Sequence, residues 1–440
     1  MKRPRECNFI KEIYMIDIKL IRNNPELVKE NIRKKFQDEK LVMVDEVAEM
    51  DKEWREDHTR CDTLRNQRNV LSKQIGGLMA KGERDKAEEA KKQVKSMQEE
   101  MARLEAREAE LEAEIRKRML VIPNIIDPLV PIGKDDSENV ELERFGEPVV
   151  PDFDIPYHTD IMERVNGIDI DAARRVSGNG FYYLKGDIAR LHSAILSYAR
   201  DFMINKGFTY CVPPFMIRSG VVSGVMSFTE MENMMYKIEG EDLYLIGTSE
   251  HSMIGSFIDT FLAEDTLPRT LTSYSPCFRK EVGAHGIEER GVYRVHQFEK
   301  QEMIVVCKPE DSMDWFEKLW QYTVEFFRSL DIPVRTIECC SGDLADLKVK
   351  SIDVEAWSPR QRKYFEVGSC SNLGDAQARR LGIRIKNKEK GNYFAHTLNN
   401  TVVAPPRTLI AYLENNLNAD GTISIPEPLR MYMGGKSIIE

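Results

Sequence analysis

The cysteines of this sequence form none of the patterns that bind metal or cross-link a small domain. Eight are present, at positions 7, 61, 211, 277, 307, 339, 340 and 370, and no two of them form a C-x-x-C pair. A chain of 440 residues also has enough length to bury an apolar core without disulfides. We therefore predict reduced thiols, no structural zinc and a cytoplasmic location.

Long apolar runs are also missing. No stretch approaches the roughly 18 apolar residues that a membrane-spanning helix needs. The segment from Met1 to Asn24 carries charges throughout and has no apolar core of a signal peptide. We therefore expect no membrane partner and no export.

Positive charge is not in excess. Lysine and arginine number 63 against 73 for aspartate and glutamate, which gives a formal net charge of −10. This balance provides no chain-wide electrostatic attraction for nucleic acid. An RNA partner would have to be met by local basic patches.

Helix breakers are scarce between about Val44 and Met119, where Gly76, Gly77 and Gly82 are the glycines and proline is absent. Residues 79–83 have room only for a reversal, so we predict two antiparallel helices of roughly 35 residues each, reaching about 50 Å. Taken alone, this pattern is equally typical of a structural or dimerising coiled coil. The apolar residues recur at steps of three and four, as in a heptad seam: Val47, Met50, Trp54, Cys61, Leu64, Leu71 and Ile75, then Val94, Met97, Met101, Leu104, Leu111 and Ile115.

The segments on either side of this region carry weaker signals. A short strand-like segment follows Met15, and Asn24 before Pro25 predicts the cap of a helix that ends near Lys35. Residues 121–151 contain prolines, glycines and acidic residues without a helical period, which is typical of a linker. Residues 152–440 mix helical and strand segments irregularly. This favours an α+β domain with an antiparallel sheet and flanking helices.

The most informative stretch runs from Pro276 to Met303 and reads as two extended segments joined by a long loop rich in glycine and charge. Side chains alternate along a strand, so Arg279 and Glu281 share one face of the outgoing segment. Phe298, Lys300 and Glu302 share one face of the return. A guanidinium, carboxylates and an aromatic ring together suit a nucleotide and an amino acid. The spacing alone also fits a solvated hairpin with scattered charges.

This stretch resembles motif 2 of the class II aminoacyl-tRNA synthetases, in the form found in seryl-tRNA synthetases of the ordinary bacterial and archaeal type. The helix predicted from Ile188 to Phe202, with the strand that ends at Pro213-Pro214, resembles motif 1. The resemblance extends from Met15 nearly to the C-terminus. It is carried by Phe278-Arg279-Lys280-Glu281, Arg290-Gly291, His296 to Glu302, Ile122-Pro123-Asn124-Ile125, Phe181-Tyr182-Tyr183-Leu184-Lys185-Gly186, Thr248-Ser249-Glu250, Ser369-Cys370-Ser371-Asn372, Gln377-Ala378-Arg379-Arg380 and Thr397-Leu398-Asn399.

The resemblance implies an enzyme that activates L-serine with ATP and Mg²⁺ to seryl-adenylate and then transfers serine to tRNA(Ser). Charging of tRNA(Sec) stays open. It also implies a homodimer and a division into a tRNA-binding domain with the coiled-coil arm (15–120), a linker (121–151) and a class II catalytic domain (152–440). Sequences of this family usually begin near Met15. Residues 1–14 are therefore expected to be a poorly ordered extension or to precede the true start.

The resemblance also implies site residues. Arg279 and Arg407 would stabilise charge during catalysis, and Glu366 and Ser369 would hold the magnesium. Serine would be bound by Thr248, Ser249, Glu250, Arg279, Glu302, Asn399 and Thr401. ATP would be bound by Arg279, Lys280, Glu281, Phe298, Glu366, Val367, Gly368, Ser369 and Arg407. His251 is assigned no role.

Two departures from the family pattern stand out. Asn400 occupies the place of a common glycine and could tighten or reshape the serine pocket. Pro405-Pro406 stands where small residues often precede the arginine, but proline is tolerated in a first helical turn. The competing readings are a relative that loads a carrier protein, another class II specificity, and a nonenzymatic RNA-binding protein. Thr248-Ser249-Glu250 taken alone is also typical of a helix cap.

Overall fold

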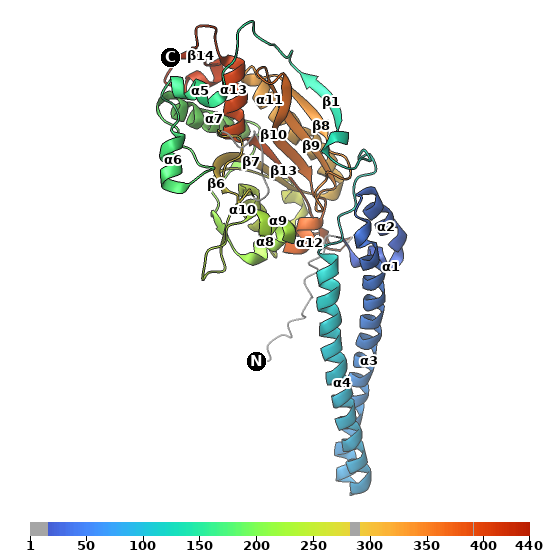
Figure 1. Ribbon diagram of the computed structural model, residues 1–440. Helices are drawn as coiled ribbons and strands as arrows, with labels where there is room; N and C mark the ends of the chain where they lie inside the picture. Colours follow the sequence, from blue (N-terminus) through green and yellow to red (C-terminus); the bar gives the residue numbers. More distant parts are fainter. Residues whose placement is uncertain (1–15, 282–290, 390) are drawn as a thin grey trace. The chain divides into compact units, whose positions relative to one another are not determined.

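The computed structural model describes residues 16–281, 291–389 and 391–440 (Figure 1). The predicted N-terminal extension, residues 1–14, and the tip of the motif 2 loop lie outside the described residues. The described chain falls into two compact units. One comprises Ile16–Arg33 and Gln37–Pro123, and the other comprises Lys34–Phe36 and Asn124–Glu440. Among the described residues, no helix is long and apolar enough to span a membrane.

The first unit is helical. Helices α3 (Leu41–Ala80) and α4 (Arg84–Met119) form the predicted antiparallel hairpin, which we call the arm. The predicted seam is buried midway along the arm, where Cys61 and Leu64 pack with Met101 and Leu104. Seam residues closer to the turn, such as Leu71, Ile75 and Val94, are only partly buried.

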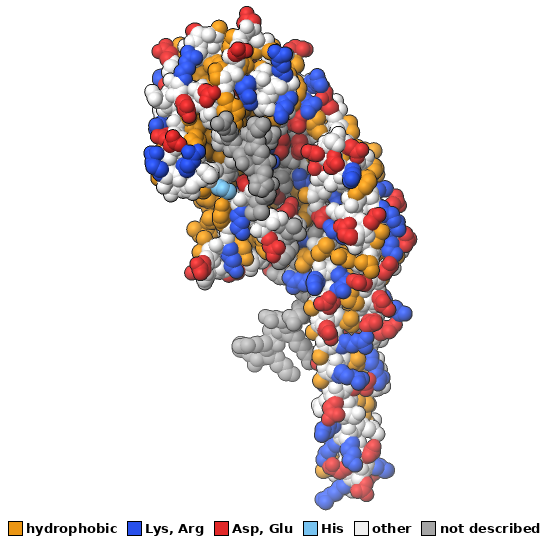
Figure 2. Space-filling view, viewed as in Figure 1, with side chains coloured by type: hydrophobic (Ala, Val, Ile, Leu, Met, Phe, Trp, Pro, Cys, Tyr) orange, Lys and Arg blue, Asp and Glu red, His pale blue; other side chains and the backbone are white. Residues whose placement is uncertain are grey.

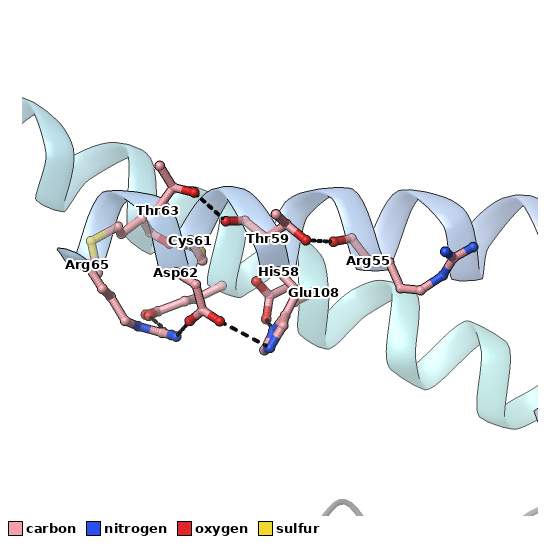
Figure 3. Close-up of polar contacts among 10 residues, drawn as sticks. Arg55, His58, Thr59, Cys61, Asp62, Thr63, Arg65 and Glu108 are labelled. Carbon is pink, nitrogen blue, oxygen red and sulfur yellow. Dashed lines mark hydrogen bonds and ion pairs between the residues drawn. The ribbon is translucent and has the colours of Figure 1, made fainter. Parts of the chain in front are cut away.

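Ion pairs join the two arm helices around this seam. Arg65 binds Glu105 (2.9 Å), Arg60 binds Glu100 (2.9 Å), and the His58 ring contacts Glu108 (3.3 Å). Figure 3 shows Arg65, Asp62, His58 and Glu108 along one side of the arm, with the hydroxyls of Thr59 and Thr63 turned back onto the α3 backbone. On the face seen in Figure 2, basic and acidic side chains alternate along the arm.

Two short helices precede the arm, α1 (Ile18–Asn23) and α2 (Pro25–Lys34). The strand predicted after Met15 was wrong, because this segment is α1 and the Asp17 carboxylate caps it by accepting from the Lys19 N–H (2.9 Å). Periodicity alone cannot separate a strand from a helix in so short an apolar run. The predicted cap of α2 does form, since the Asn24 side chain accepts from the Leu27 N–H (3.3 Å).

The second unit is built on an eight-stranded sheet in the order β1-β8-β9-β10-β13-β7-β6-β2. Every neighbouring pair is antiparallel except β2 and β6. This agrees with the predicted α+β class. In sheet order the strands are Val140–Phe145, Val334–Glu338, Lys350–Ser358, Lys363–Asn372, His396–Val403, Gln297–Cys307, Arg269–Phe278 and Thr209–Tyr210.

Helices cover both faces of the central strands. On β7, Met303, Val305 and Cys307 pack into a core with α7 (Gly186–Asn205), α11 (Ser312–Ser329) and α13 (Pro405–Asn416). The alternate residues, Ile304 and Val306, pack into a second core with α8 (Ser219–Val225), α10 (Ser249–Gly255) and α12 (Ala376–Leu381). The two faces of β7 therefore have separate environments, as the alternation of side chains requires.

The remaining elements are short. Small sheets are formed by β3 with β4, by β12 with β11 and β5, and by β14 with β15. Their bounds are Met216–Ile217, Tyr244–Leu245, Tyr393–Phe394, Arg384–Lys386, Phe261–Ala263, Ile423–Ser424 and Ile438–Ile439. The other α-helices are α5 (His158–Arg164), α6 (Ile170–Ser177), α9 (Phe228–Met234) and α14 (Glu427–Arg430).

The structure differs from the predicted linker over residues 121–151. The boundary between the compact units falls at Pro123, and Val140–Phe145 is β1, the edge strand of the large sheet. All but the last of its side chains are exposed. The sequence alternates over Val140-Glu141-Leu142-Glu143 but not beyond Arg144, and neither face of the strand is buried, so the signal is too short to predict a strand.

Candidate active site

Several of the predicted site residues come from separate strands but share one face of the sheet. On β7 this is the face of Ile304 and Val306, to which Phe298, Lys300 and Glu302 also belong. On β13, Thr401 pairs with Glu302 and Asn399 with Ile304, so their side chains lie on the same face. The face meets α10 and α12. The alternation of strand residues therefore brings distant motifs together.

The base of the motif 2 hairpin is fixed on both sides. The predicted pair of strands forms as β6 and β7, and beyond β6 the Arg279 N–H donates to the His296 carbonyl (2.9 Å). The His296 N–H donates to the Gly180 carbonyl (2.9 Å). Gly180 has φ +78°, and a Cβ there would lie 2.5 Å from the His296 ring. Glycine is therefore needed at this close approach.

Arg279 lines a pocket. Its guanidinium stands over the Phe298 ring (5.3 Å to the centroid), and its Nε donates to the Gly247 carbonyl (3.2 Å). Glu281 has φ +48° and so does not continue the strand, but it still lines the same pocket. The pocket is lined by Arg279, Glu281, Tyr293, Arg294, Val295, Phe298, Lys300, Glu366, Val367, Gly368, Thr401, Ala404, Pro406 and Arg407. A cation above an aromatic face suits a phosphate beside a base.

Arg407 is another cationic residue of this pocket. It is the third residue of α13, after Pro405 and Pro406, which occupy the first turn as predicted. Its Nη1 binds the Glu366 carboxylate (3.0 Å), and its guanidinium stands over the Tyr293 ring (4.7 Å). Burial opposes ionisation of Glu366, but the charge and hydrogen bond of Arg407, together with the charges of Lys348 and Arg279, outweigh it and hold the pKa of Glu366 below its usual range.

A buried polar cluster lies behind the pocket. Glu302 is 1% exposed and binds the Lys300 ammonium, and the Thr248 hydroxyl donates to the same carboxylate oxygen (3.1 Å). Lys300 also reaches the Thr401 hydroxyl (3.5 Å). Thr248 additionally caps α10 by accepting from the Glu250 N–H (3.4 Å). The helix cap is therefore confirmed, and the same threonine also belongs to the buried cluster.

Glu250 adds a second carboxyl group to this cluster. Burial and the nearby charge of Glu302 raise its pKa to about 7, although Gln377, Lys300 and Lys348 act in the opposite direction. A buried carboxyl group whose pKa lies near neutrality is typical of a functional site.

Ser369 lies on β10 opposite Asp353 of β9. Its hydroxyl is 3.4 Å from Lys348 Nζ and from the Ser351 hydroxyl. Burial and the charge of Glu366 raise the pKa of Asp353 to about 6. Among the described residues, no cluster of three or more histidine, cysteine, aspartate or glutamate side chains is arranged to hold a metal ion.

Some predicted residues lie outside the pocket. Lys280 donates to the Glu232 carbonyl on the surface, and Ser249 is buried against the Ser273 carbonyl. The Asn400 side chain points away from the residues predicted to bind serine. Its side-chain amide donates to the Leu319 carbonyl (2.8 Å) and the Thr323 hydroxyl (2.9 Å) of α11, on the opposite face of β13 from Asn399 and Thr401.

Other residues of the site were not assigned a role from the sequence. Lys300 could have been, because it alternates with Phe298 and Glu302. Tyr293 and Gln377 could not, because their places depend on tertiary contacts with Arg407 and Glu250. The assigned roles of the pocket residues remain predictions.

Family models match both parts of the chain. Residues 234–416 match the tRNA synthetase class II core domain (G, H, P, S and T), and residues 15–126 match the seryl-tRNA synthetase N-terminal domain. With its antiparallel sheet and the motif residues on one face, the chain is a class II aminoacyl-tRNA synthetase.

Individual relatives narrow this class. The serine–tRNA ligase of Methanoculleus marisnigri is 40% identical over 97% of this chain and 100% of its own length. The crystal structure of seryl-tRNA synthetase from Pyrococcus horikoshii complexed with ATP has a TM-score of 0.92 at 39% identity, covering 96% of this chain and 99% of that one. The crystal structure of the cytoplasmic serine–tRNA ligase of Naegleria fowleri in complex with AMP has a TM-score of 0.86 at 33% identity, covering 96% of this chain and 98% of that one. The chain belongs to the seryl-tRNA synthetase family, which confirms the family, fold class and enzyme class predicted from the sequence.

Proposed function

We propose that this chain activates L-serine with ATP and transfers the serine to tRNA(Ser). One observation carries the proposal: the pocket with Arg279, Phe298 and Arg407 adjoins the buried cluster of Glu302, Thr248 and Thr401 on a single sheet face. The pocket suits a nucleotide with its phosphates, and the cluster suits a small polar amino acid. Adjacent sites for both substrates are what adenylate formation requires.

In the first step, the serine carboxylate attacks the α-phosphorus of ATP, and pyrophosphate leaves. Arg279 would bridge the α-phosphate and the serine carboxylate, with the adenine ring against Phe298 and its amine donating to Glu281. Arg407 would hold the γ-phosphate. No protein nucleophile is needed, because two fixed guanidinium groups can position the reactants and stabilise the developing charge.

Magnesium fits the donors that are present. Mg²⁺ usually takes one or two carboxylates together with substrate phosphates and water. Glu366 offers a carboxylate whose side chain is 44% exposed, and Ser369 offers a hydroxyl on the same strand. When bound there, the ion would neutralise charge on the ATP phosphates. Arg407 already binds the Glu366 carboxylate and would hold it in place.

Serine selectivity follows from the buried cluster. Glu302 and Thr401 would bind the substrate hydroxyl, and Glu250 its ammonium group. A site that hydrogen-bonds a substrate hydroxyl can reject an analogue without one by roughly 10⁴- to 10⁵-fold, because its buried polar groups would be left unpaired. Alanine would thus be excluded without a proofreading site.

In the second step, a terminal ribose hydroxyl of tRNA attacks the carbonyl carbon of the acyl-adenylate, so that an ester forms, the hydroxyl loses its proton, and AMP leaves as the anhydride bond breaks. The arm would bind the tRNA through basic residues on its surface, with Arg60 and Arg65 already paired to Glu100 and Glu105. The chain would work as a cytoplasmic homodimer through α7 and β2, with the arm of one subunit holding tRNA for the other. Charging of tRNA(Sec) is a further candidate activity.

The test is ATP–pyrophosphate exchange measured with each amino acid in turn, with and without magnesium. We expect exchange that depends on serine and on magnesium. Exchange with threonine or glycine but not with serine would overturn the specificity. Assays of serine transfer to purified tRNA(Ser) and tRNA(Sec), run separately, then show which tRNA is a substrate.

A further inference from the structure

Gln377 links the buried cluster to Thr397 of β13, a residue that has no contact with substrate in the proposed scheme. It is the second residue of α12 and is 1% exposed. Its Nε2 donates to Glu250 Oε1 (2.9 Å) and to the Val225 carbonyl (3.2 Å). Its Oε1 accepts from the hydroxyl of Thr397 on β13 (2.7 Å), which is fully buried.

These contacts allow one orientation of the Gln377 amide. In the reverse orientation its oxygen would face the Glu250 carboxylate and the Val225 carbonyl, which are both acceptors. The Thr397 hydroxyl donates to the oxygen and so favours the observed orientation. Thr397, Gln377 and Glu250 thus form a chain of hydrogen bonds that ends on one carboxylate oxygen.

The effect on Glu250 is geometric and electrostatic. The bond fixes Oε1, while among the described residues Oε2 forms no hydrogen bond. A hydrogen bond donated to a carboxylate also favours its ionised form, which opposes the effect of burial and of Glu302. A fixed and ionised carboxylate is what an ammonium group requires.

We propose that Gln377, oriented by Thr397, is a positioning residue of the serine site that fixes Glu250 Oε1, so that Oε2 binds the ammonium group of the substrate. This inference rests on the proposed function. Gln377 itself touches no substrate, so its loss should weaken serine binding and leave ATP binding unchanged.

The test replaces Gln377 with methionine, which has a similar shape and no donor. In pyrophosphate exchange at saturating ATP, Gln377→Met should raise the KM for serine about 10- to 100-fold, because a bond to a charged group is lost. The KM for ATP should stay within about twofold, since the nucleotide contacts are intact. Tyr412→Phe is the matched control: it removes another buried hydrogen bond, from the Tyr412 hydroxyl to the Ser424 carbonyl (2.8 Å), and should leave both KM values unchanged.

A second set of variants replaces Thr397. Thr397→Val should raise the serine KM by a smaller factor, and Thr397→Ser, which keeps the hydroxyl, should restore it. In the Gln377→Met background, Thr397→Val should have no further effect, because the two residues act through one chain of bonds. If Gln377→Met fails to fold, Thr397→Val and Thr397→Ser still test the positioning role.

The outcomes separate the two proposals. A wild-type protein without serine-dependent exchange overturns the proposed function itself. A serine-active wild type whose Gln377→Met and Thr397→Val variants keep their serine KM, or raise the ATP KM equally, overturns the positioning role alone. Independent effects of the two substitutions in the double variant would also overturn it.

Discussion

One ion pair of the arm and one of the catalytic unit lie in opposite environments. Arg65 and Glu105, which join α3 to α4 beside the apolar seam, are 38% and 49% exposed. In the catalytic unit, Lys300 and Glu302 are 8% and 1% exposed and lie beside the pocket. Removing a charge from water costs free energy, whereas an exposed pair costs and contributes little. The Lys300–Glu302 pair beside the pocket therefore carries a desolvation cost that the Arg65–Glu105 pair on the arm does not.

Shortening the arm should show which reaction step depends on the arm and which on the catalytic unit alone. Residues 59–107 can be replaced by a short Gly/Ser linker that joins His58 to Glu108, whose side chains are in contact (3.3 Å). This keeps the buried Asp51, which binds Arg22. Transfer of serine to tRNA should fall to background, while pyrophosphate exchange stays within about twofold of wild type. Survival of charging would contradict the role of the arm, and loss of both activities in a folded protein would make the arm part of the catalytic core.

Within the catalytic unit, Arg279 should have the largest effect. Arg279→Ala should lower kcat/KM for exchange by about 10³-fold, because it removes a preorganised cation from the transition state. Thermal unfolding should change little. Lys280→Ala is the control, since Lys280 bonds a surface carbonyl instead of lining the pocket. A fully active Arg279→Ala enzyme would refute the assignment.

Substitutions in the buried cluster should impair the use of serine but not the binding of ATP. Glu302→Gln and Thr401→Val remove groups proposed to bind the substrate hydroxyl, so each should lower kcat/KM for serine by about 10- to 100-fold. The preference for serine over alanine should shrink, and Thr401→Ser should retain activity. Glutamine is preferable to alanine at 302, because alanine would leave the Lys300 ammonium buried and unpaired. A selective rise in the ATP KM would reassign both residues.

The pH dependence should also distinguish the two substrates. The pKa of Glu250 is raised to about 7, and only its ionised form attracts the serine ammonium group. A proton therefore competes with serine as the pH falls below 7. The KM for serine should rise about tenfold from pH 8 to pH 6, with the ATP KM nearly constant. A flat profile for serine would mean that Glu250 does not bind the ammonium group.

The smallest effect is expected on the arm itself. Arg65→Ala breaks an exposed pair with Glu105, so it should reduce the free energy of unfolding by less than about 1 kcal/mol. Leu64→Ala is the contrast, because Leu64 is 1% exposed in the seam and should cost about 2 kcal/mol or more. Denaturant unfolding of both variants measures the difference. Equal losses would contradict the contrast drawn between exposed and buried groups.

The sequence predicted those parts of the molecule whose signals are local. The heptad spacing gave both arm helices, and the alternation of Phe298, Lys300 and Glu302 gave the functional face of β7. It did not predict β1, whose side chains are nearly all exposed, or the orientation of Asn400, which depends on the packing of α11 against β13. The contacts of Tyr293 with Arg407 and of Gln377 with Glu250 could not be predicted either, because no sequence period connects these residues.

The position of β7 affects how specificity would fail on heating. This strand lies inside the sheet, is hydrogen-bonded on both sides and is buried on both faces from Lys300 to Cys307. Backbone amides in such a strand exchange with solvent only through large-scale opening. Glu302 therefore belongs to the part of the molecule that unfolds last. Discrimination between serine and alanine should stay constant up to the unfolding transition and vanish together with activity.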